Sequence, residues 1–482
     1  MKKKFTVLFV GMAALALLVS ACGTPATPTE VAAPSPTDPP PATATPTVEP
    51  TKTPKPTKEP PKTGPLATAA ALSAQTTLVP PTPIGGFDAS DLKADDYAGI
   101  VEQAWHIIKA NYVRDNYNGV DWDAVHEEYA VLAQDVTSSE ELWDLLADLV
   151  HELNDDHSRF VPPANMQAEF GVGISGANDE DPLPWTGINV WPGPSREDEY
   201  FYAWDVCSIS PAANAGIERG DVILAVDGEE LVPGEEGFTR EQVNAVTFGT
   251  GGDTVTLTVQ SGPDEEPRDV EVTLGGAGGC MDWVYEVVSQ DPYIAYIRIP
   301  DFDGDAADNI RSAIETFEAD QPLDGLILDV RHNPGGNSDD AAGIFADGVV
   351  GTEGPLREDK QRTSYRIRGV DWNDTTPLVV LTDGSSHSAA DYFPAALKEL
   401  DRATIIGMNS AGNTEGIISF SLADGTLIRL AVMTMALNDG TLLEGIGVTP
   451  DIEVPLGMWG LRQRPYDVQL QTAIDFLVQE AQ

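Results

Sequence analysis

The sequence predicts a multi-domain α/β protein with a helical N-terminal region, a β-rich middle domain and an α/β C-terminal core. Apolar residues recur at helical spacing within residues 89–165, and short β-branched and aromatic runs separated by Gly and Asp occupy residues 166–278. Strand-like and helix-like segments then alternate over residues 279–482, which is typical of a layered fold with parallel strands. The 482 residues, 41% of them apolar, suffice for about three domains with buried cores.

The charge of the chain excludes two classes of partner. The formal net charge is −49, from 28 Lys and Arg against 77 Asp and Glu. Residues 1–86 hold seven Lys and four acids, so residues 87–482 carry 21 basic and 73 acidic residues, a net of −52. Nucleic acid and anionic lipid surfaces both require a basic face, so neither is an expected partner of the folded body. A solvated, self-repelling surface is the simplest interpretation, and a salt-rich habitat or a cationic partner is the alternative.

Residues 1–22 have the pattern of a secretory signal. Three lysines precede an apolar run from Phe5 to Val19, and the small residues Ser20 and Ala21 follow before Cys22. The run is shorter than the roughly 20 residues that cross a bilayer. A Cys directly after small residues resembles the bacterial lipobox, in which that Cys becomes the lipid-bearing first residue. We therefore expect an extracytoplasmic lipoprotein anchored to a bacterial membrane through Cys22, and an ordinary signal peptide is the alternative.

Residues 23–88 are predicted to form a disordered tether. Residues 24–86 contain 17 Pro and 15 Thr, a composition that favours extended polyproline II and lacks the side chains for a core. Of the two remaining cysteines, Cys207 and Cys280 can pair in an oxidising compartment, or they can be two free thiols. The sequence contains no Cys-x-x-Cys pair and no Walker-type phosphate loop, so we expect neither a metal nor another cofactor.

The region 89–165 is predicted to be helical. One helix runs from Asp95 to Tyr112, and a second opens at Ser138 with Glu141 three residues later, which is the pattern of a capping box. A stripe of leucines at helical spacing follows, and the second helix ends near Asn154. His157 therefore lies in a polar loop just past a helix end.

The region 166–278 contains strand-like runs at 201–204, 222–226 and 255–259. Between them, the stretch from Ser210 to Ile223, with its small residues followed by Gly220-Asp221, resembles a PDZ domain of the bacterial protease type. The Asp227-Gly228 turn supports the same resemblance. PDZ domains bind peptide C-termini by adding a strand to a sheet edge. The resemblance implies a carboxylate-binding edge at 170–174, beside an acidic, Pro-rich insertion at 179–199.

The region 279–482 is predicted to alternate strand and helix. Strands are expected at 293–299, 325–330, 378–381 and 403–406, and helices at 305–319 and from the turn after Leu381 to Leu400.

Two segments of this core carry reactive groups. In the first, the strand Leu328–Val330 leads into Arg331-His332-Asn333-Pro334-Gly335-Gly336, where backbone N–H groups can point outward as an oxyanion hole requires. In the second, a strand turns through Ser385-Ser386-His387-Ser388 into a helix, which is the geometry of a nucleophile elbow. Taken alone, the first is a common Gly-rich loop and the second is also the composition of a helix N-cap.

Together, these segments make the sequence resemble the C-terminal processing (tail-specific) serine peptidase family. The resemblance spans residues 94–455 and includes an Asp-x-His-Ser motif at Asp155–Ser158, the PDZ-like domain, both core segments and the Gly445–Ile452 motif. It implies a catalytic core of the ClpP/crotonase type, built of ββα units, and a serine endopeptidase acting near exposed C-termini of polypeptides. By residue match Ser388 is the nucleophile, and the oxyanion hole comes from Gly335 or Gly336 together with the N–H of Ser388 itself or of Ala389.

One position departs from the family pattern. Better-known members use a Ser–Lys dyad, and their lysine falls at Asn413, whose amide cannot accept the serine proton. A branch similar to tricorn protease uses Ser, His and Glu, which implies His157 as the base and Glu444 as its orienting partner. Glu415 is the rival for the third role, and His332 and His387 are weaker candidates for the base. Asp391 is expected either to orient a loop or to be a plain first-turn acid.

Two other functions remain open from the sequence. The absence of the lysine is compatible with a non-catalytic PDZ and peptidase-like binding lipoprotein, and the core type is compatible with acyl-transfer or hydratase chemistry, although no segment resembles a CoA site. The sequence does not indicate the oligomeric state or the natural substrate.

Overall fold

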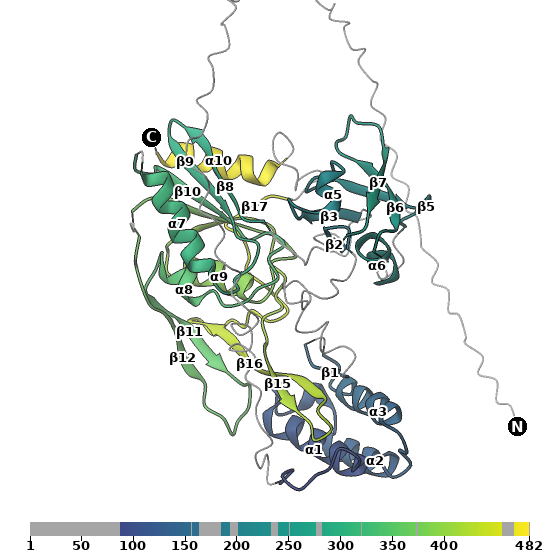
Figure 1. Cartoon of the computed structure of the whole chain (residues 1–482). Coiled ribbons are helices and arrows are strands. Elements are labelled where there is room, and N and C mark those ends of the chain that lie inside the picture. The colour runs from purple at the N-terminus through teal and green to yellow at the C-terminus, as the bar shows by residue number, and fades with distance from the viewer. Residues whose placement is uncertain are drawn as a thin grey trace, which may run out of the picture. The chain divides into compact units, whose positions relative to one another are not determined.

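The computed structural model describes residues 87–155, 157–162, 185–192, 201–232, 240–249, 251–275, 282–319, 321–372, 375–455 and 467–481 (Figure 1). The predicted signal with Cys22, nearly all of the tether, the 170–174 edge and Cys280 lie outside these residues. Within the described ranges, no helix combines the length and apolar character needed to cross a membrane.

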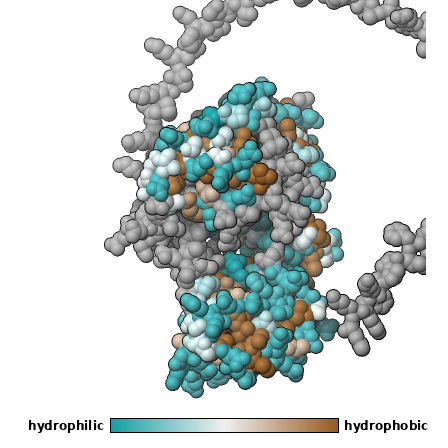
Figure 2. All heavy atoms as spheres, turned by 90° about the vertical axis from the view of Figure 1, so that its right-hand side faces the viewer, coloured by the Kyte–Doolittle hydropathy of each residue, from teal (hydrophilic) through white to brown (hydrophobic). Residues whose placement is uncertain are grey.

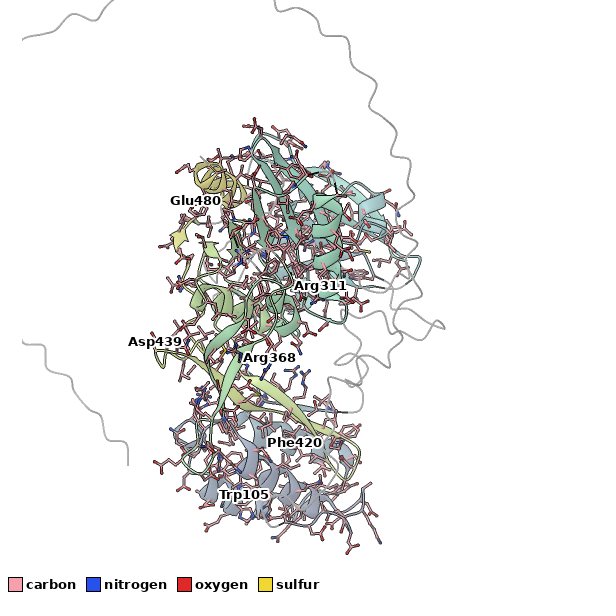
Figure 3. All side chains as sticks on the ribbon, turned by 90° about the vertical axis from the view of Figure 1, so that its left-hand side faces the viewer. Trp105, Arg311, Arg368, Phe420, Asp439 and Glu480 are labelled. Atoms are coloured by element: carbon pink, nitrogen blue, oxygen red, sulfur yellow. The ribbon has the colours of Figure 1, made fainter. Side chains whose placement is uncertain are left out.

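The N-terminal region is helical, as predicted. It comprises α1 (Tyr97–Asn111), the 3-10 turn η2 (Tyr117–Gly119), α2 (Trp122–Leu132) and α3 (Ser139–His151). The side chains of Asp96, Asp121 and Ser138 accept hydrogen bonds from backbone N–H groups in the first turns of the three α-helices, which stabilises each helix start. The apolar faces pack into one core together with residues of the strands β15 and β16, including Phe420, which is labelled with Trp105 in Figure 3.

The middle domain is an antiparallel β-sheet with its own core. Its elements are β2 (Ile188–Pro192), β3 (Phe201–Val206), α5 (Pro211–Asn214), β4 (Val222–Val226), β5 (Glu229–Glu230), α6 (Arg240–Thr247), β6 (Thr254–Gln260) and β7 (Arg268–Thr273). The sheet order is β2-β3-β4-β6-β7, with β5 paired to β4 across the predicted Asp227-Gly228 turn. The stretch expected to be an insertion contains β2, so part of it belongs to the sheet. Cys207 is disulfide-bonded.

The C-terminal core contains a six-stranded sheet in the order β17-β14-β13-β10-β9-β8. Its elements are β8 (Val284–Gln290), β9 (Tyr293–Arg298), α7 (Ala306–Glu318), β10 (Gly325–Asp329), α8 (Asp339–Gly343), β13 (Leu378–Thr382), α9 (Ala389–Glu399), β14 (Thr404–Gly407), β17 (Ile452–Glu453) and α10 (Val468–Glu480). All strands of this sheet but β8 are parallel. Every residue of β10 and β13 is buried, because helices cover both faces of the sheet. Functional loops gather at the carboxyl ends of such strands.

A third sheet joins the helical region to the core, and sequence reasoning did not identify its strands. It consists of β1 (Arg159–Val161), β11 (Gly348–Gly354), β12 (Thr363–Ile367), β15 (Gly416–Ser421) and β16 (Leu427–Leu437), in the order β1-β16-β11-β12 with β15 also paired to β16. Since β1 begins two residues after His157 and pairs with Leu427–Arg429, this sheet fixes the histidine loop against the core.

The surface agrees with the charge distribution of the sequence. On the face drawn in Figure 2, hydrophilic residues predominate among the coloured atoms and apolar residues form smaller patches between them. A body with a net charge of −52, from 21 basic and 73 acidic residues, is expected to present such a surface to water.

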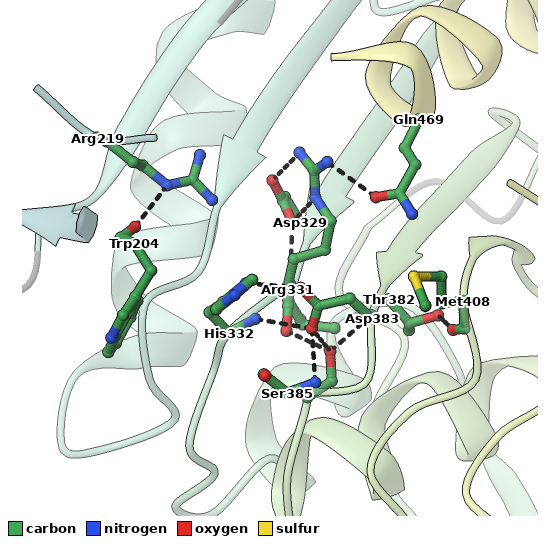
Figure 4. Close-up of polar contacts among 12 residues, drawn as sticks. Trp204, Arg219, Asp329, Arg331, His332, Thr382, Asp383, Ser385, Met408 and Gln469 are labelled. Carbon is green, nitrogen blue, oxygen red and sulfur yellow. Dashed lines mark hydrogen bonds and ion pairs between the residues drawn. The ribbon is translucent and has the colours of Figure 1, made fainter. Parts of the chain in front are cut away.

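Arg331 is a fully buried side chain of the core with five hydrogen bonds (Figure 4). Its guanidinium donates to Asp329 at 2.7 and 2.9 Å, to Asp467 at 2.7 and 2.9 Å, and to Gln469 at 3.0 Å. The pKa of Asp329 lies well below its usual range, because Arg331 outweighs the opposing effect of burial. The arginine therefore joins the end of β10 to the start of α10.

We predict that Arg331→Met lowers the free energy of unfolding by about 3–5 kcal/mol, because it leaves two buried carboxylates without their cation. The matched control is Arg311→Met, since Arg311 pairs with the exposed Asp308 and Asp371 (Figure 3) and its loss should cost less than about 1 kcal/mol. Urea denaturation of both variants checks the difference, and equal midpoints for the two would contradict it.

Candidate active site

Ser388 lies at the turn between β13 and α9, as the sequence predicted. Its backbone has φ 53° and ψ −113°, a conformation that L-residues rarely adopt, and its side chain does not cap the helix. Its N–H donates to the carbonyl of Asn413 at 2.9 Å. Strained residues held this way cluster at functional sites, where the turn projects a side chain from the sheet edge.

The Gly335-Gly336 loop lies directly against this turn. A Cβ on Gly335 would come within 2.7 Å of the Ser388 Cβ and 3.1 Å of the Ala389 nitrogen, so only glycine fits there. The Gly335 N–H already donates to the Asn333 side chain at 2.8 Å. Gly336 lies opposite Phe302 in parallel register. The two hydrogen bonds to Phe302 come from the residues before and after Gly336, so the N–H of Gly336 itself points away from Phe302.

Ala389 is the first residue of α9, so its N–H has no helical carbonyl four residues before it. Of the predicted oxyanion donors, geometry therefore favours Gly336 and Ala389 over Gly335 and over the Ser388 N–H, which donates to Asn413.

The structure brings His157 and Glu444 together. The His157 side chain, which is 3% exposed, has its Nε2 at 2.8 Å from Oε1 of Glu444. The other carboxylate oxygen of Glu444 accepts from the N–H and the hydroxyl of Thr414, at 2.7 and 3.0 Å. Burial alone would raise the pKa of Glu444, but the hydrogen bonds from His157 and Thr414 outweigh burial, and the pKa lies below its ordinary value. Glu444 is therefore a carboxylate, suited to stabilise a protonated imidazole.

Glu415, the rival for the third role, pairs with Arg114 instead. Its side chain is 1% exposed. Burial raises the pKa of Glu415 to about 7, although Arg114 opposes the rise, and the charge of Glu444 adds to it. The structure thus assigns the hydrogen bond with His157 to Glu444 and leaves Glu415 as a second buried carboxyl nearby.

Four other histidines have different surroundings. His332 has its Nδ1 at 2.6 Å from Oδ2 of Asp383 and its ring stacked on Trp204 of β3 (Figure 4). His106 and His126 both contact Glu102 on the helical region, and His151 is exposed at the end of α3.

Asp391 orients a loop, which was one of its two predicted roles. Its fully buried Oδ1 accepts from the Ser410 hydroxyl at 2.5 Å and from the Gly412 N–H at 2.8 Å. Lys398, which follows Ser388 on α9, pairs with Asp451 at 2.7 Å, in the lining of a pocket of about 540 Å³ that contains none of the predicted site residues.

Sequence reasoning missed three residues of this site. Thr414 holds Glu444, Asp155 accepts from the backbone N–H of His157 at 2.9 Å, and Arg114 pairs with Glu415. Asp155 belongs to the Asp-x-His-Ser motif, so the sequence contained a signal for it. Thr414 and Arg114 act through partners that are distant in sequence, so no local pattern indicates them. Across the described ranges, no group of His, Cys, Asp and Glu has the arrangement to hold a metal ion.

Three ranges of the chain match known protein families. Residues 293–454 match peptidase family S41, residues 93–151 match the tricorn protease C1 domain, and residues 205–261 match a PDZ domain. A carboxyl-terminal-processing protease of Synechocystis sp. is 26% identical over 389 residues, covering 78% of this chain and 85% of that protein. A carboxy-terminal-processing protease of Bartonella bacilliformis is 31% identical over 271 residues, covering 54% and 59%.

A solved structure of a photosystem II D1 C-terminal processing protease shares the fold. Its TM-score is 0.55 at 21% sequence identity, and the match covers 74% of this chain and 92% of that one. The predicted fold class is confirmed: a helical N-terminal region, a PDZ domain and a peptidase core. The chain is accordingly a serine-type peptidase whose residues 293–454 match peptidase family S41.

Proposed function

We propose that the chain is a carboxyl-terminal-processing serine endopeptidase in which Ser388 is the nucleophile, His157 the general base and Glu444 the residue that orients His157. One observation carries the assignment: Nε2 of His157 lies 2.8 Å from Glu444, and the loop that binds Glu444 through Thr414 also binds the Ser388 N–H through Asn413. A base oriented by a carboxylate and joined to a strained serine turn is the arrangement that acyl transfer needs.

The reaction follows from these positions. Ser388 Oγ attacks the carbonyl carbon of the scissile peptide, and its proton passes to Nδ1 of His157, because Nε2 is hydrogen-bonded to Glu444. The negative oxygen of the tetrahedral intermediate accepts from the N–H groups of Gly336 and Ala389. The imidazolium then protonates the leaving amine as the C–N bond breaks, and water deprotonated by His157 releases the acyl group from Ser388.

The position of the family lysine supports this mechanism over a Ser–Lys dyad. Asn413 is neutral and contributes its backbone carbonyl to the Ser388 N–H, so its role here is to hold the turn. The nearest lysine, Lys398, is engaged by Asp451 and the carbonyl of Thr449.

We further propose that the PDZ domain recruits polypeptides with exposed C-termini. The match of residues 205–261 to a PDZ domain and the names of the similar carboxyl-terminal-processing proteases support this. PDZ domains bind such termini by strand addition, with backbone N–H groups around the terminal carboxylate.

The N-terminal pattern supports a third proposal, that the enzyme is held on the outer side of a bacterial membrane by lipid on Cys22. The Pro- and Thr-rich residues 24–86 would then separate the peptidase body from the bilayer, by on the order of 150–200 Å at full polyproline II extension.

Replacing the proposed catalytic residues tests the mechanism. Ser388→Ala and His157→Ala should each lower kcat/KM on a denatured protein substrate by at least about 10³-fold, and Glu444→Gln by about 10²–10⁴-fold, because each loses part of the proton-transfer unit. His151→Ala, an exposed histidine on α3, is the control. Cleavage that is absent from both wild type and Ser388→Ala would support the non-catalytic binding protein instead, and cleavage that is equal in both would refute Ser388 as the nucleophile. Full activity in His157→Ala with loss in His332→Ala would make His332 the base.

Two peptides of identical sequence test the recruitment proposal, one ending in a free carboxylate and the other in an amide. The free acid should be cleaved with at least about tenfold higher kcat/KM, mainly through a lower KM, because the PDZ domain binds the terminal charge. Equal kinetic constants for the two peptides would refute recruitment by C-termini without affecting the catalytic assignment.

Fractionation of cells producing the full chain tests the tether. Wild type should sediment with membranes, and Cys22→Ser should appear in the soluble extracytoplasmic fraction because it lacks the acylated thiol. Membrane association that is the same for both would refute the lipid anchor.

A further inference from the structure

A second buried carboxyl group, Glu415, lies beside the His157–Glu444 pair, and the proposed mechanism makes no use of it. Its side chain is 1% exposed and forms an ion pair with Arg114. Glu415 directly follows Thr414, whose N–H and hydroxyl both bind Glu444. A movement of Glu415 therefore changes the support of Glu444.

Arg114 connects this carboxylate to the loop that bears His157. Arg114 follows α1 and interacts with the hydroxyl of Tyr112, which in turn interacts with Asp155. Asp155 accepts from the backbone N–H of His157 at 2.9 Å and from that of Ser158 at 2.6 Å. One polar network thus reaches both partners of the His157–Glu444 pair, from the end of α1 and from the loop before β15.

The charged and titratable groups that act on Glu415 come from three segments of the described residues. Arg114 and Tyr112 face it from the end of α1, Asp155 and His157 from the loop after α3, and Glu444 from the loop before β17. Arg114 is the cation of this group, and its side chain is 25% exposed. The protonation of Glu415 therefore changes the charge next to His157 directly.

We propose that Arg114 and Glu415 are positioning residues of the peptidase: their ion pair holds the Thr414 loop against Glu444 and sets the charge beside His157. The proposal rests on the proposed function, since it assumes that His157 is the base. Burial raises the pKa of Glu415 to about 7, so this group exchanges its proton in the range where an imidazole base also titrates.

The sign of the effect follows from electrostatics. The base must be neutral, so activity falls as pH drops below the pKa of His157. A negative charge on Glu415 stabilises the imidazolium and raises that pKa, whereas Arg114 without its partner lowers it. Removing the Glu415 charge must therefore shift the acidic limb of the pH profile to lower pH.

The test measures the rate at which a fluorophosphonate probe labels the full chain, as a function of pH, because this rate reports the nucleophile and base without a peptide substrate. Glu415→Gln, which keeps the shape of the side chain, should shift the acidic limb down by at least about 0.5 pH unit, equivalent to about threefold faster labelling relative to the plateau at low pH. Adding Arg114→Met to that variant should move the limb back up, because the unpaired cation is gone. Glu318→Gln, a change to a glutamate that accepts from Trp372, is the control and should leave the limb in place.

Each outcome separates the two proposals. A limb that stays within 0.2 pH unit of wild type in Glu415→Gln, with or without a lower plateau, overturns the charge-setting role and leaves Glu415 purely structural. If Glu415→Gln does not fold, the double variant is compared with Arg114→Met alone, because these two proteins differ only in the charge of residue 415. The double variant must show an acidic limb at lower pH, and a displacement of less than 0.2 unit overturns the proposal. Labelling that is unchanged in His157→Ala refutes the proposed base, and with it the premise, irrespective of Glu415.

Discussion

The buried carboxylate of Asp391 is the interaction on which the geometry of the site depends. It accepts from the Ser410 hydroxyl at 2.5 Å and the Gly412 N–H at 2.8 Å, and the same hydroxyl accepts from the Val448 N–H at 2.7 Å. One side chain of α9 therefore holds the loop of Ser410 and the loop that follows Glu444 in a fixed position relative to Ser388. Burial raises the pKa of Asp391 to about 6, and its hydrogen bonds oppose that rise. Such a group is costly to bury without partners, and the site supplies them.

This support allows strained backbone to persist at the reactive positions. Ser388 has φ 53° and His332 has φ 59°, and residues in such regions cost of order 1–3 kcal/mol each. The surrounding structure fixes them: the Ser388 N–H donates to Asn413, and the His332 N–H donates to Asp383 at 3.1 Å. The close approach of Gly335 to Ser388 adds a steric limit that no other residue satisfies. Strain, buried hydrogen bonds and close packing together fix the serine turn against the glycine loop, as an acyl-transfer site requires.

Much of the fold followed from local patterns, whereas most of the site did not. The helices α1 and α3 and the strands β9, β10, β13 and β14 were predictable, because periodicity and capping are local signals. The third sheet was missed, because its strands pair over long distances, as Arg159 does with Arg429. The sequence pattern predicted Ser388 at a strand-to-helix turn. The candidates His157 and Glu444, which are 287 residues apart, came from a family resemblance. The Arg114–Glu415 pair had no sequence signal at all, since an ion pair between distant segments leaves no periodic trace.

The central claim is that Ser388, His157 and Glu444 form one proton-transfer unit beside the glycine loop. A crystal structure of the chain inactivated by an organophosphonate tests it most directly, because the adduct marks the nucleophile, the oxyanion donors and the base together. We predict phosphorus bonded to Ser388 Oγ, its anionic oxygen within hydrogen-bond distance of the Gly336 and Ala389 nitrogens, and the His157 ring between the adduct and Glu444. An adduct on another serine, or one facing His332 and Asp383 instead of His157, would contradict the account.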